Sequence, residues 1–148
     1  MDTHTLISAG ALIYSSSTGR YLFLLRNGAS YNNTWGLVGG KLEPDETIYQ
    51  GLHREIFEEV GKCEIEKLIP LEQFTSENKR FIYHTYLGVV ADEFIPSLNE
   101  EHKGYCWVKL DNYPKPLHPG VWNTFKFESV MEKIKTFEFI NRSLEQTV

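Results

Sequence analysis

The chain has 148 residues, of which 41% are hydrophobic and 14% aromatic, so a packed core is expected and wholesale disorder is excluded. This length predicts one domain over residues 1–148, with no room for a second independent core. The formal net charge of −5 argues against binding to duplex nucleic acid, which depends on neutralising phosphates, but it is compatible with a small phosphorylated ligand held through a metal ion.

The start of the chain and its two cysteines indicate where the protein works. Met1–Ala9 contains no basic segment ahead of an apolar stretch, so no signal peptide is expected. The longest apolar runs, such as residues 9–14, are far too short for a membrane span. Cys63 and Cys106 are too few for a disulfide scaffold, which favours reduced thiols. We therefore expect a cytoplasmic protein with no membrane partner.

Six apolar stretches, most of them bounded by turn residues, stand out along the chain, and all except the short third one are predicted to form strands. In chain order they cover residues 5–15, 20–26, 35–38, 64–75, 80–90 and 105–110. The first two flank the turn residues 16–19 and predict an antiparallel hairpin. The third runs into Gly39 and Gly40, whose lack of side chains lets a phosphate or a metal ion approach the backbone.

Residues 48–60 change to a helical spacing of apolar positions. Thr47 and Gln50 fit a capping box at the start of this helix, and Gly61 stands where a left-handed C-terminal cap is expected. A second helical pattern begins at about residue 120. Strands on both sides of one central helix, with another helix at the end, predict a mixed-sheet α/β sandwich.

Three carboxylates share one face of the predicted central helix. With Glu55 at 0° and 100° per residue, Glu59 falls at about 40° and Glu58 at about 300°, an arc of about 100°. Like charges at these spacings each destabilise a helix by about a few tenths of a kcal/mol. Arg54 cannot pair with all three, so a hard divalent cation, Mg²⁺ or Mn²⁺, is expected to relieve the rest. Taken alone, the segment also fits an ordinary solvated helix face.

The wider pattern around this helix resembles the Nudix box of the MutT-like Nudix hydrolases, G-x5-E-x7-R-E-U-x-E-E-x-G-U, where U is a bulky apolar residue. The seven fixed residues of that pattern are present as Gly40, Glu46, Arg54, Glu55, Glu58, Glu59 and Gly61. A chance match of all seven is on the order of one in 10⁸ per start position. The match departs at Lys62, the final apolar position, and at Val38, where the family often has proline.

The resemblance implies an α/β/α sandwich with a mixed sheet. It also implies an enzyme that requires Mg²⁺ or Mn²⁺ and hydrolyses a nucleoside diphosphate linked to another group. The metal-site groups that it implies are Glu55, Glu58, Glu59 and a backbone carbonyl, that of Gly39 rather than Gly40. By the same resemblance, Arg54 orients a carboxylate of the box and Glu46 braces the loop that leads into the helix.

The sequence leaves alternatives for the residues that act on the substrate. A carboxylate is expected to accept the proton of water during in-line attack at phosphorus. The resemblance leaves that role among Glu58, Glu100 and Glu101, the last two standing just before the final predicted strand. Arg26 and Lys41 either contact phosphate or lie at the surface.

The substrate is expected to be a small-molecule nucleotide: a nucleoside triphosphate, a dinucleoside polyphosphate or a nucleotide sugar. Trp35, Phe81 and Tyr83 either stack on its base or pack in the core. The phenylalanines near the C-terminus fit either a homodimer interface or the core. They are Phe125, Phe127, Phe137 and Phe139.

The alternative to an enzyme is a nucleotide or ADP-ribose sensor on the same fold. Such a binder would be expected to lose carboxylates of the box, and here all are present. An isoprenyl diphosphate isomerase is disfavoured because neither Cys63 nor Cys106 lies in a context that suggests a catalytic cysteine. Decapping of mRNA is disfavoured by the acidic balance of the chain.

Overall fold

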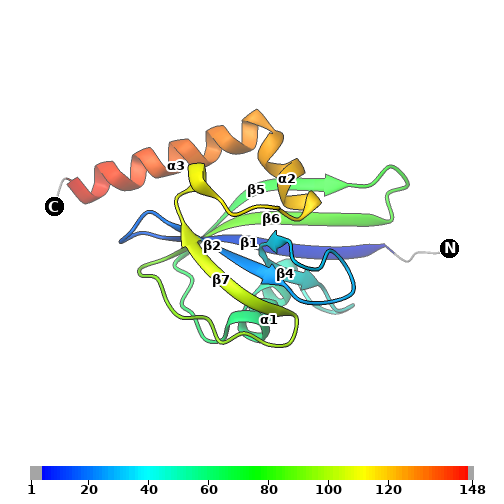
Figure 1. Cartoon of the computed structure of the whole chain (residues 1–148). Coiled ribbons are helices and arrows are strands. Elements are labelled where there is room, and N and C mark those ends of the chain that lie inside the picture. Colours follow the sequence, from blue (N-terminus) through cyan, green and yellow to red (C-terminus); the bar gives the residue numbers. More distant parts are fainter. Residues whose placement is uncertain (1–4, 147–148) are drawn as a thin grey trace.

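The computed structural model describes residues 5–146. Residues 1–4, the first part of the segment in which no signal peptide is expected, lie outside the described residues. A mixed sheet lies between one helix and a pair of helices (Figure 1). Helix α1 (Ile48–Val60) covers one face, and helices α2 (Pro119–Lys126) and α3 (Glu128–Gln146) cover the other. The predicted α/β/α sandwich is confirmed.

The sheet is built from seven strands. They are β1 (Leu6–Ser15), β2 (Tyr21–Arg26), β3 (Trp35–Gly36), β4 (Val38–Lys41), β5 (Lys67–Thr75), β6 (Phe81–Val90) and β7 (His102–Val108). A single turn of 3-10 helix, Leu110–Asn112, follows β7.

The sheet divides at β1, because this strand changes its partner along its length. On one side it pairs in parallel with β6 throughout. On the other side it pairs antiparallel with β4 over residues 8–11, and with β2 at Ile13 and Tyr14. The glycines of β4 therefore lie close to the point at which β1 changes its partner from β4 to β2.

Three boundaries differ from the sequence prediction. The stretch 35–38 contains the whole of the short strand β3 and the first residue of β4, which continues through Gly39 and Gly40, so the glycine pair belongs to the sheet. Strand β7 begins at His102, three residues earlier than predicted, because these residues pair with β2 across a bulge. The terminal helical pattern forms two helices, since Phe127 adopts extended backbone angles (φ −78°, ψ 122°) between them.

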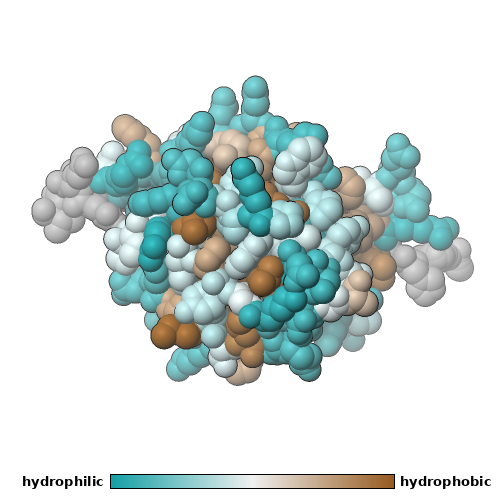
Figure 2. All heavy atoms as spheres, in the orientation of Figure 1, coloured by the Kyte–Doolittle hydropathy of each residue, from teal (hydrophilic) through white to brown (hydrophobic). Residues whose placement is uncertain are grey.

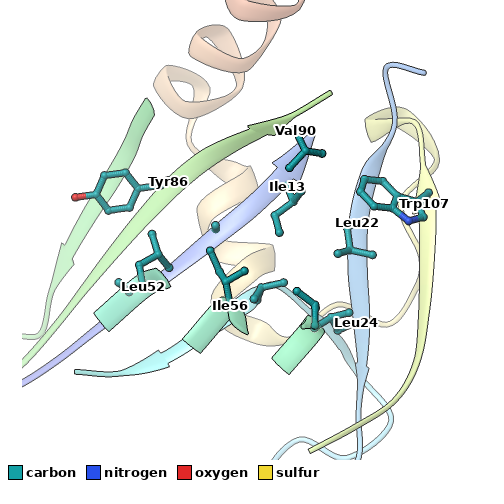
Figure 3. Close-up of a cluster of buried hydrophobic side chains, with 12 residues drawn as sticks. Ile13, Leu22, Leu24, Leu52, Ile56, Tyr86, Val90 and Trp107 are labelled. Atoms are coloured by element: carbon teal, nitrogen blue, oxygen red, sulfur yellow. The ribbon is translucent and has the colours of Figure 1, made fainter. Parts of the chain in front are cut away.

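Alternation along β1 supplies both hydrophobic cores. Ala11 and Ile13 face α1, where they meet Leu52 and Ile56 (Figure 3), whereas Leu12 faces α2 and α3 on the opposite side. Full burial of a leucine or isoleucine side chain stabilises the fold by about 1.5–3 kcal/mol. The apolar stripe of α1 therefore fixes the rotation of the helix, and with it the direction of the carboxylates on the neighbouring stripe.

Both ends of α1 are formed as predicted. The Gln50 amide N–H donates to Thr47 Oγ1 (3.1 Å), and the Thr47 amide N–H donates to Gln50 Oε1 (3.0 Å). Gly61 ends the helix with φ 87°, in the region that favours glycine. Lys62 is exposed, and Cys63 packs against the α1 core in its place, so the departure from the box moves the apolar contact by one residue.

Candidate active site

The carboxylates of α1 meet the backbone of β4 at the glycine pair. Glu59 is only 2% exposed, and its Oε1 accepts a hydrogen bond from the Gly39 amide N–H at 3.0 Å. A Cβ on Gly40 would lie 2.5 Å from the carboxyl carbon of Glu55. The approach of α1 therefore leaves no room for a side chain at Gly40 unless Glu55 moves, whereas a Cβ on Gly39 would meet the backbone of β1.

The pKa of Glu59 is raised to about 8, mainly by burial and to a smaller extent by the charges of Glu55 and Glu101, while the Gly39 hydrogen bond acts in the opposite direction. Burial is also the main reason that the pKa of Glu55 is raised, with Arg54 acting in the opposite direction. When two neighbouring carboxylates both have raised pKa values, a bound proton or a cation is needed to stabilise the pair near neutral pH. Such groups beside a cleft are typical of a functional site.

This electrostatic cost predicts how stability depends on pH. Without divalent cations, the free energy of unfolding should fall between about pH 5 and pH 9 by on the order of a few kcal/mol. The Glu59 carboxyl titrates near 8 when folded and near 4.5 when unfolded, so its stabilising contribution is complete below pH 4.5 and is lost as the pH rises through 8. Urea unfolding in EDTA would measure this in the wild type and in Glu59→Gln. Parallel curves for the two proteins would contradict the prediction.

Arg54 joins the loop before α1 to the carboxylates. Its guanidinium donates to both oxygens of Glu46 (2.5 and 2.9 Å), and these bonds are the main reason that the pKa of Glu46 is lowered to about 2. It also donates to Glu55 Oε2 (3.1 Å), Glu58 Oε1 (3.3 Å) and the carbonyl of Lys41 (3.1 Å). This is the geometry expected of an arginine that orients carboxylates and a glutamate that braces the loop.

Replacing Arg54 by lysine should lower kcat/KM by about 10–100-fold, the range found when groups that orient metal ligands are lost. An ammonium group has no planar fork, so it cannot hold Glu46 in a bidentate pair and reach Glu55 at the same time. Hydrolysis should be measured at saturating and limiting Mg²⁺, with Arg142→Lys on the exposed side of α3 as the control. Equal activity in the two variants would show that the Arg54 network is not needed.

Hydrogen bonds of the Asn99 side chain, which no pattern in the sequence predicted, hold Glu101 near the carboxylate cluster. The Asn99 side-chain amide donates to the carbonyl of Glu58 (3.0 Å), and its Oδ1 accepts from the Glu101 amide N–H (2.9 Å). The charge of Glu101, and not that of Glu100, is among those that raise the pKa of Glu55 and Glu59. Of the two candidate general bases before β7, Glu101 is therefore the one whose charge acts on the carboxylate cluster.

The oxygen donors at this place fit Mg²⁺ or Mn²⁺, which prefer carboxylate and carbonyl ligands. Within residues 5–146, however, no three His, Cys, Asp or Glu side chains converge as a complete ligand set. The reason is visible in the contacts: Arg54 holds Glu55 and Glu58, and the Gly39 amide holds Glu59. Side-chain rotation toward a cation is needed before all three carboxylates could bind it.

A cleft of about 870 Å³ extends from Gly39 and Gly40 across the sheet and beneath α2. Its volume lies in the range of small-molecule sites, about 300–1,000 Å³. Its aromatic wall consists of Phe74, Phe81 and Tyr83, with neighbouring ring centroids 6.2 Å apart. The cleft is therefore large enough for a nucleotide and has a surface on which a planar ring can stack.

The substrate-contact alternatives separate in the structure. Arg26, at the end of β2, lines the cleft, whereas Lys41 is exposed and offers its carbonyl to Arg54. Trp35 packs against the core beneath α2 and α3. Phe81 and Tyr83 belong to the cleft, so of the three aromatic residues only these two are placed to contact a base.

Two residues of the cleft were not found from the sequence. Glu72 and Thr124 lie at its far end and come from β5 and α2, 52 positions apart in the chain. Gly10, in an otherwise apolar strand, is explained by Tyr83, because a Cβ there would overlap the tyrosine hydroxyl. An isolated glycine within a strand is a sequence signal for a close approach of another group, and here that group is the Tyr83 side chain.

The fold is a mixed-sheet sandwich, and its helix α1 turns clustered carboxylates toward a glycine pair. The glycine pair lines a nucleotide-sized cleft. This is the architecture of the Nudix proteins. The chain belongs to the NUDIX family: the sequence model of the NUDIX domain matches residues 4–127. The chain is similar to the nucleoside triphosphatase NudI of Escherichia fergusonii, with 37% identity over 87 residues, 51% of this chain and 61% of the relative. It is 34% identical over 89 residues to NudI of Escherichia coli, covering 53% of this chain and 63% of that relative.

Solved structures show the same fold. The MutT NUDIX hydrolase from Burkholderia pseudomallei superposes with a TM-score of 0.70 at 27% identity, covering 84% of this chain and 98% of that one. The MutT protein from Methanosarcina mazei gives 0.64 at 28% identity, covering 85% and 94%. The match to NudI spans less than two thirds of the length of those relatives, so their activity is not carried over directly.

Proposed function

We propose that the protein is a metal-dependent pyrophosphohydrolase that acts on a nucleoside diphosphate-linked small molecule. The observation that carries this proposal is the buried Glu59, whose carboxylate accepts a hydrogen bond from Gly39, a residue that lines a nucleotide-sized cleft. A sensor on the same fold has no need to maintain a buried and a half-buried carboxylate whose ionisation is unfavourable.

In this proposal Glu55, Glu58 and Glu59, with the carbonyl of Gly39, hold the cation. A bound Mg²⁺ or Mn²⁺ neutralises diphosphate charge and lowers the pKa of water. Glu101 accepts the proton of the attacking water, because the Glu58 carboxylate, another candidate, serves as a ligand of the cation in this proposal.

The binding of the phosphates and the choice of substrate rest on the cleft. Arg26, which lines the cleft and carries a charge that acts on Glu59, binds the phosphates. The names of the NudI relatives favour a nucleoside triphosphate over a dinucleoside polyphosphate or a nucleotide sugar.

The partners and location follow the same proposal. Phe125 and Phe137 pack in the core, whereas Phe127 and Phe139 are more than half exposed, so only the latter pair is available to a homodimer interface. The face shown in Figure 2 is largely hydrophilic, with small, separate apolar patches. Among the described helices, none combines the length and the apolar character needed to cross a membrane. A single cytoplasmic domain and self-association stay predictions.

The test is a panel of nucleoside di- and triphosphates, nucleotide sugars and dinucleoside polyphosphates, assayed with Mg²⁺, Mn²⁺ or EDTA. We expect turnover of at least one class that depends on the cation, and analysis of the products will identify the bond that is cleaved. Binding of nucleotides without turnover of any compound would favour the sensor instead.

A further inference from the structure

The cleft crosses the sheet in a direction that the strand register defines. Gly39 on β4 lies opposite Gly10 on β1, Gly10 lies opposite Thr85 on β6, and Thr85 lies opposite Glu72 on β5. Three spacings of about 4.8 Å place Glu72 about 14 Å from Gly39. That separation is comparable with the reach of an extended nucleoside diphosphate, so a substrate with its phosphates at Gly39 brings its base to Glu72.

Glu72 presents a carboxylate with spare acceptor capacity to the far end of the cleft. Its Oε1 accepts one hydrogen bond, from Thr124 Oγ1 on α2 at 2.7 Å, and Thr124 is only 8% exposed. Among residues 5–146 no basic side chain forms an ion pair with Glu72. Lys126, which also lines the cleft, lies over the Trp122 ring, 4.2 Å from its centroid. An ionised carboxylate has about four lone-pair sites, so Glu72 can accept further N–H donors.

The walls beside Glu72 define the shape of the group that it meets. Phe74 on β5 and Tyr83 on β6 lie opposite each other, and Phe81 stands two residues before Tyr83 on β6. Helix α2 lies over these strands (Figure 1). Aromatic walls beneath a covering helix favour a planar ring. The acceptor at the end of that slot favours a ring with N–H donors along one edge.

We propose that Glu72 recognises the base of the substrate and that the cleft favours a guanine nucleotide. The ring N1–H and the neighbouring exocyclic amine of guanine are two adjacent donors that match the two oxygens of one carboxylate. Adenine and cytosine present an amine beside a bare ring nitrogen, and uracil and thymine flank their single N–H with carbonyls that repel a carboxylate. The inference rests on the proposed function and names the substrate class of the same site.

The experiment compares kcat/KM for GTP, ATP, CTP and UTP in the wild type and in Glu72→Gln. We expect the wild type to prefer GTP, and Glu72→Gln to lose about 5- to 150-fold for GTP alone, the discrimination given by a bidentate pair with a base. Thr124→Val, which removes the hydroxyl that orients Glu72, should reduce the same preference to a smaller extent. Glu66→Gln, an exposed glutamate just before β5, is the matched control and should leave all four substrates unchanged.

A binding measurement separates this inference from the proposed function. The affinities for GMP, AMP, CMP and UMP in EDTA require no turnover, and GMP should bind best to the wild type and lose that advantage in Glu72→Gln. Hydrolysis without preference for guanine would overturn the role of Glu72 and leave the hydrolase in place. Binding of GMP that depends on Glu72, without any hydrolysis, would support the role of Glu72 and refute the hydrolase.

Discussion

Glu59→Gln is expected to lower kcat/KM by about 10²–10³-fold, the effect typical of removing one group that stabilises charge in a reacting centre. Glutamine has the same shape, and its amide oxygen can still accept the Gly39 N–H bond, which is 3.0 Å long in the wild type. The side chain is 2% exposed, so no other residue can take its place without movement of α1. The substitution therefore removes the negative charge and little else.

Two further measurements show whether the lost charge is the cause. The affinity for Mn²⁺ should fall in Glu59→Gln, while the melting temperature in EDTA should be unchanged or raised, because a buried carboxylate without a cation is destabilising. Glu128→Gln, at the exposed start of α3, serves as the control and should behave as the wild type. Activity of Glu59→Gln within a few fold of the control would remove Glu59 from the reacting centre.

The sequence predicted the central helix well because the signals for it are local. Thr47, Gln50 and Gly61 lie within one turn of the helix ends that they define. That the three carboxylates share one face followed from helical spacing, whereas their direction toward β4 is seen only in the structure. Elements whose boundaries depend on partners were less accurate: β7 begins early because it extends its pairing with β2.

The far end of the cleft could not be predicted because no local pattern encodes it. Glu72 reads as one polar residue in an edge strand, and Thr124 as one polar residue in a short helix. Their hydrogen bond exists only because β5 and α2 pack together on one face of the sheet. Likewise, Asn99 gave no signal of its own, although it fixes the loop that carries Glu101. The candidate carboxylates could therefore be predicted from local spacing, whereas the proposed recognition of the base rests on contacts that only the tertiary structure makes.

Gly39→Ala is expected to lower the free energy of unfolding by about 2–4 kcal/mol, at the upper end of the usual effects of single substitutions. Gly39 has φ 154°, and a Cβ on it would overlap the carbonyl oxygen of Ala9 and the Cα of Gly10. These atoms belong to the backbone of β1 and cannot rotate away. Strand β4 must therefore separate from β1, and the amide that holds Glu59 moves with it, so hydrolysis should fall even at temperatures where the variant is folded.

Two other glycine substitutions distinguish this strain from a general effect of adding a methyl group. In Gly40→Ala the new atom meets the Glu55 carboxylate, 2.5 Å away, and that side chain can swing aside. Activity should therefore fall while stability changes little. In Gly28→Ala the methyl group meets no atom within 4 Å, and neither property should change. Urea unfolding and kcat/KM of the three variants test this order. If Gly39→Ala were as stable as Gly28→Ala, the close contact between β4 and β1 would not be what positions Glu59.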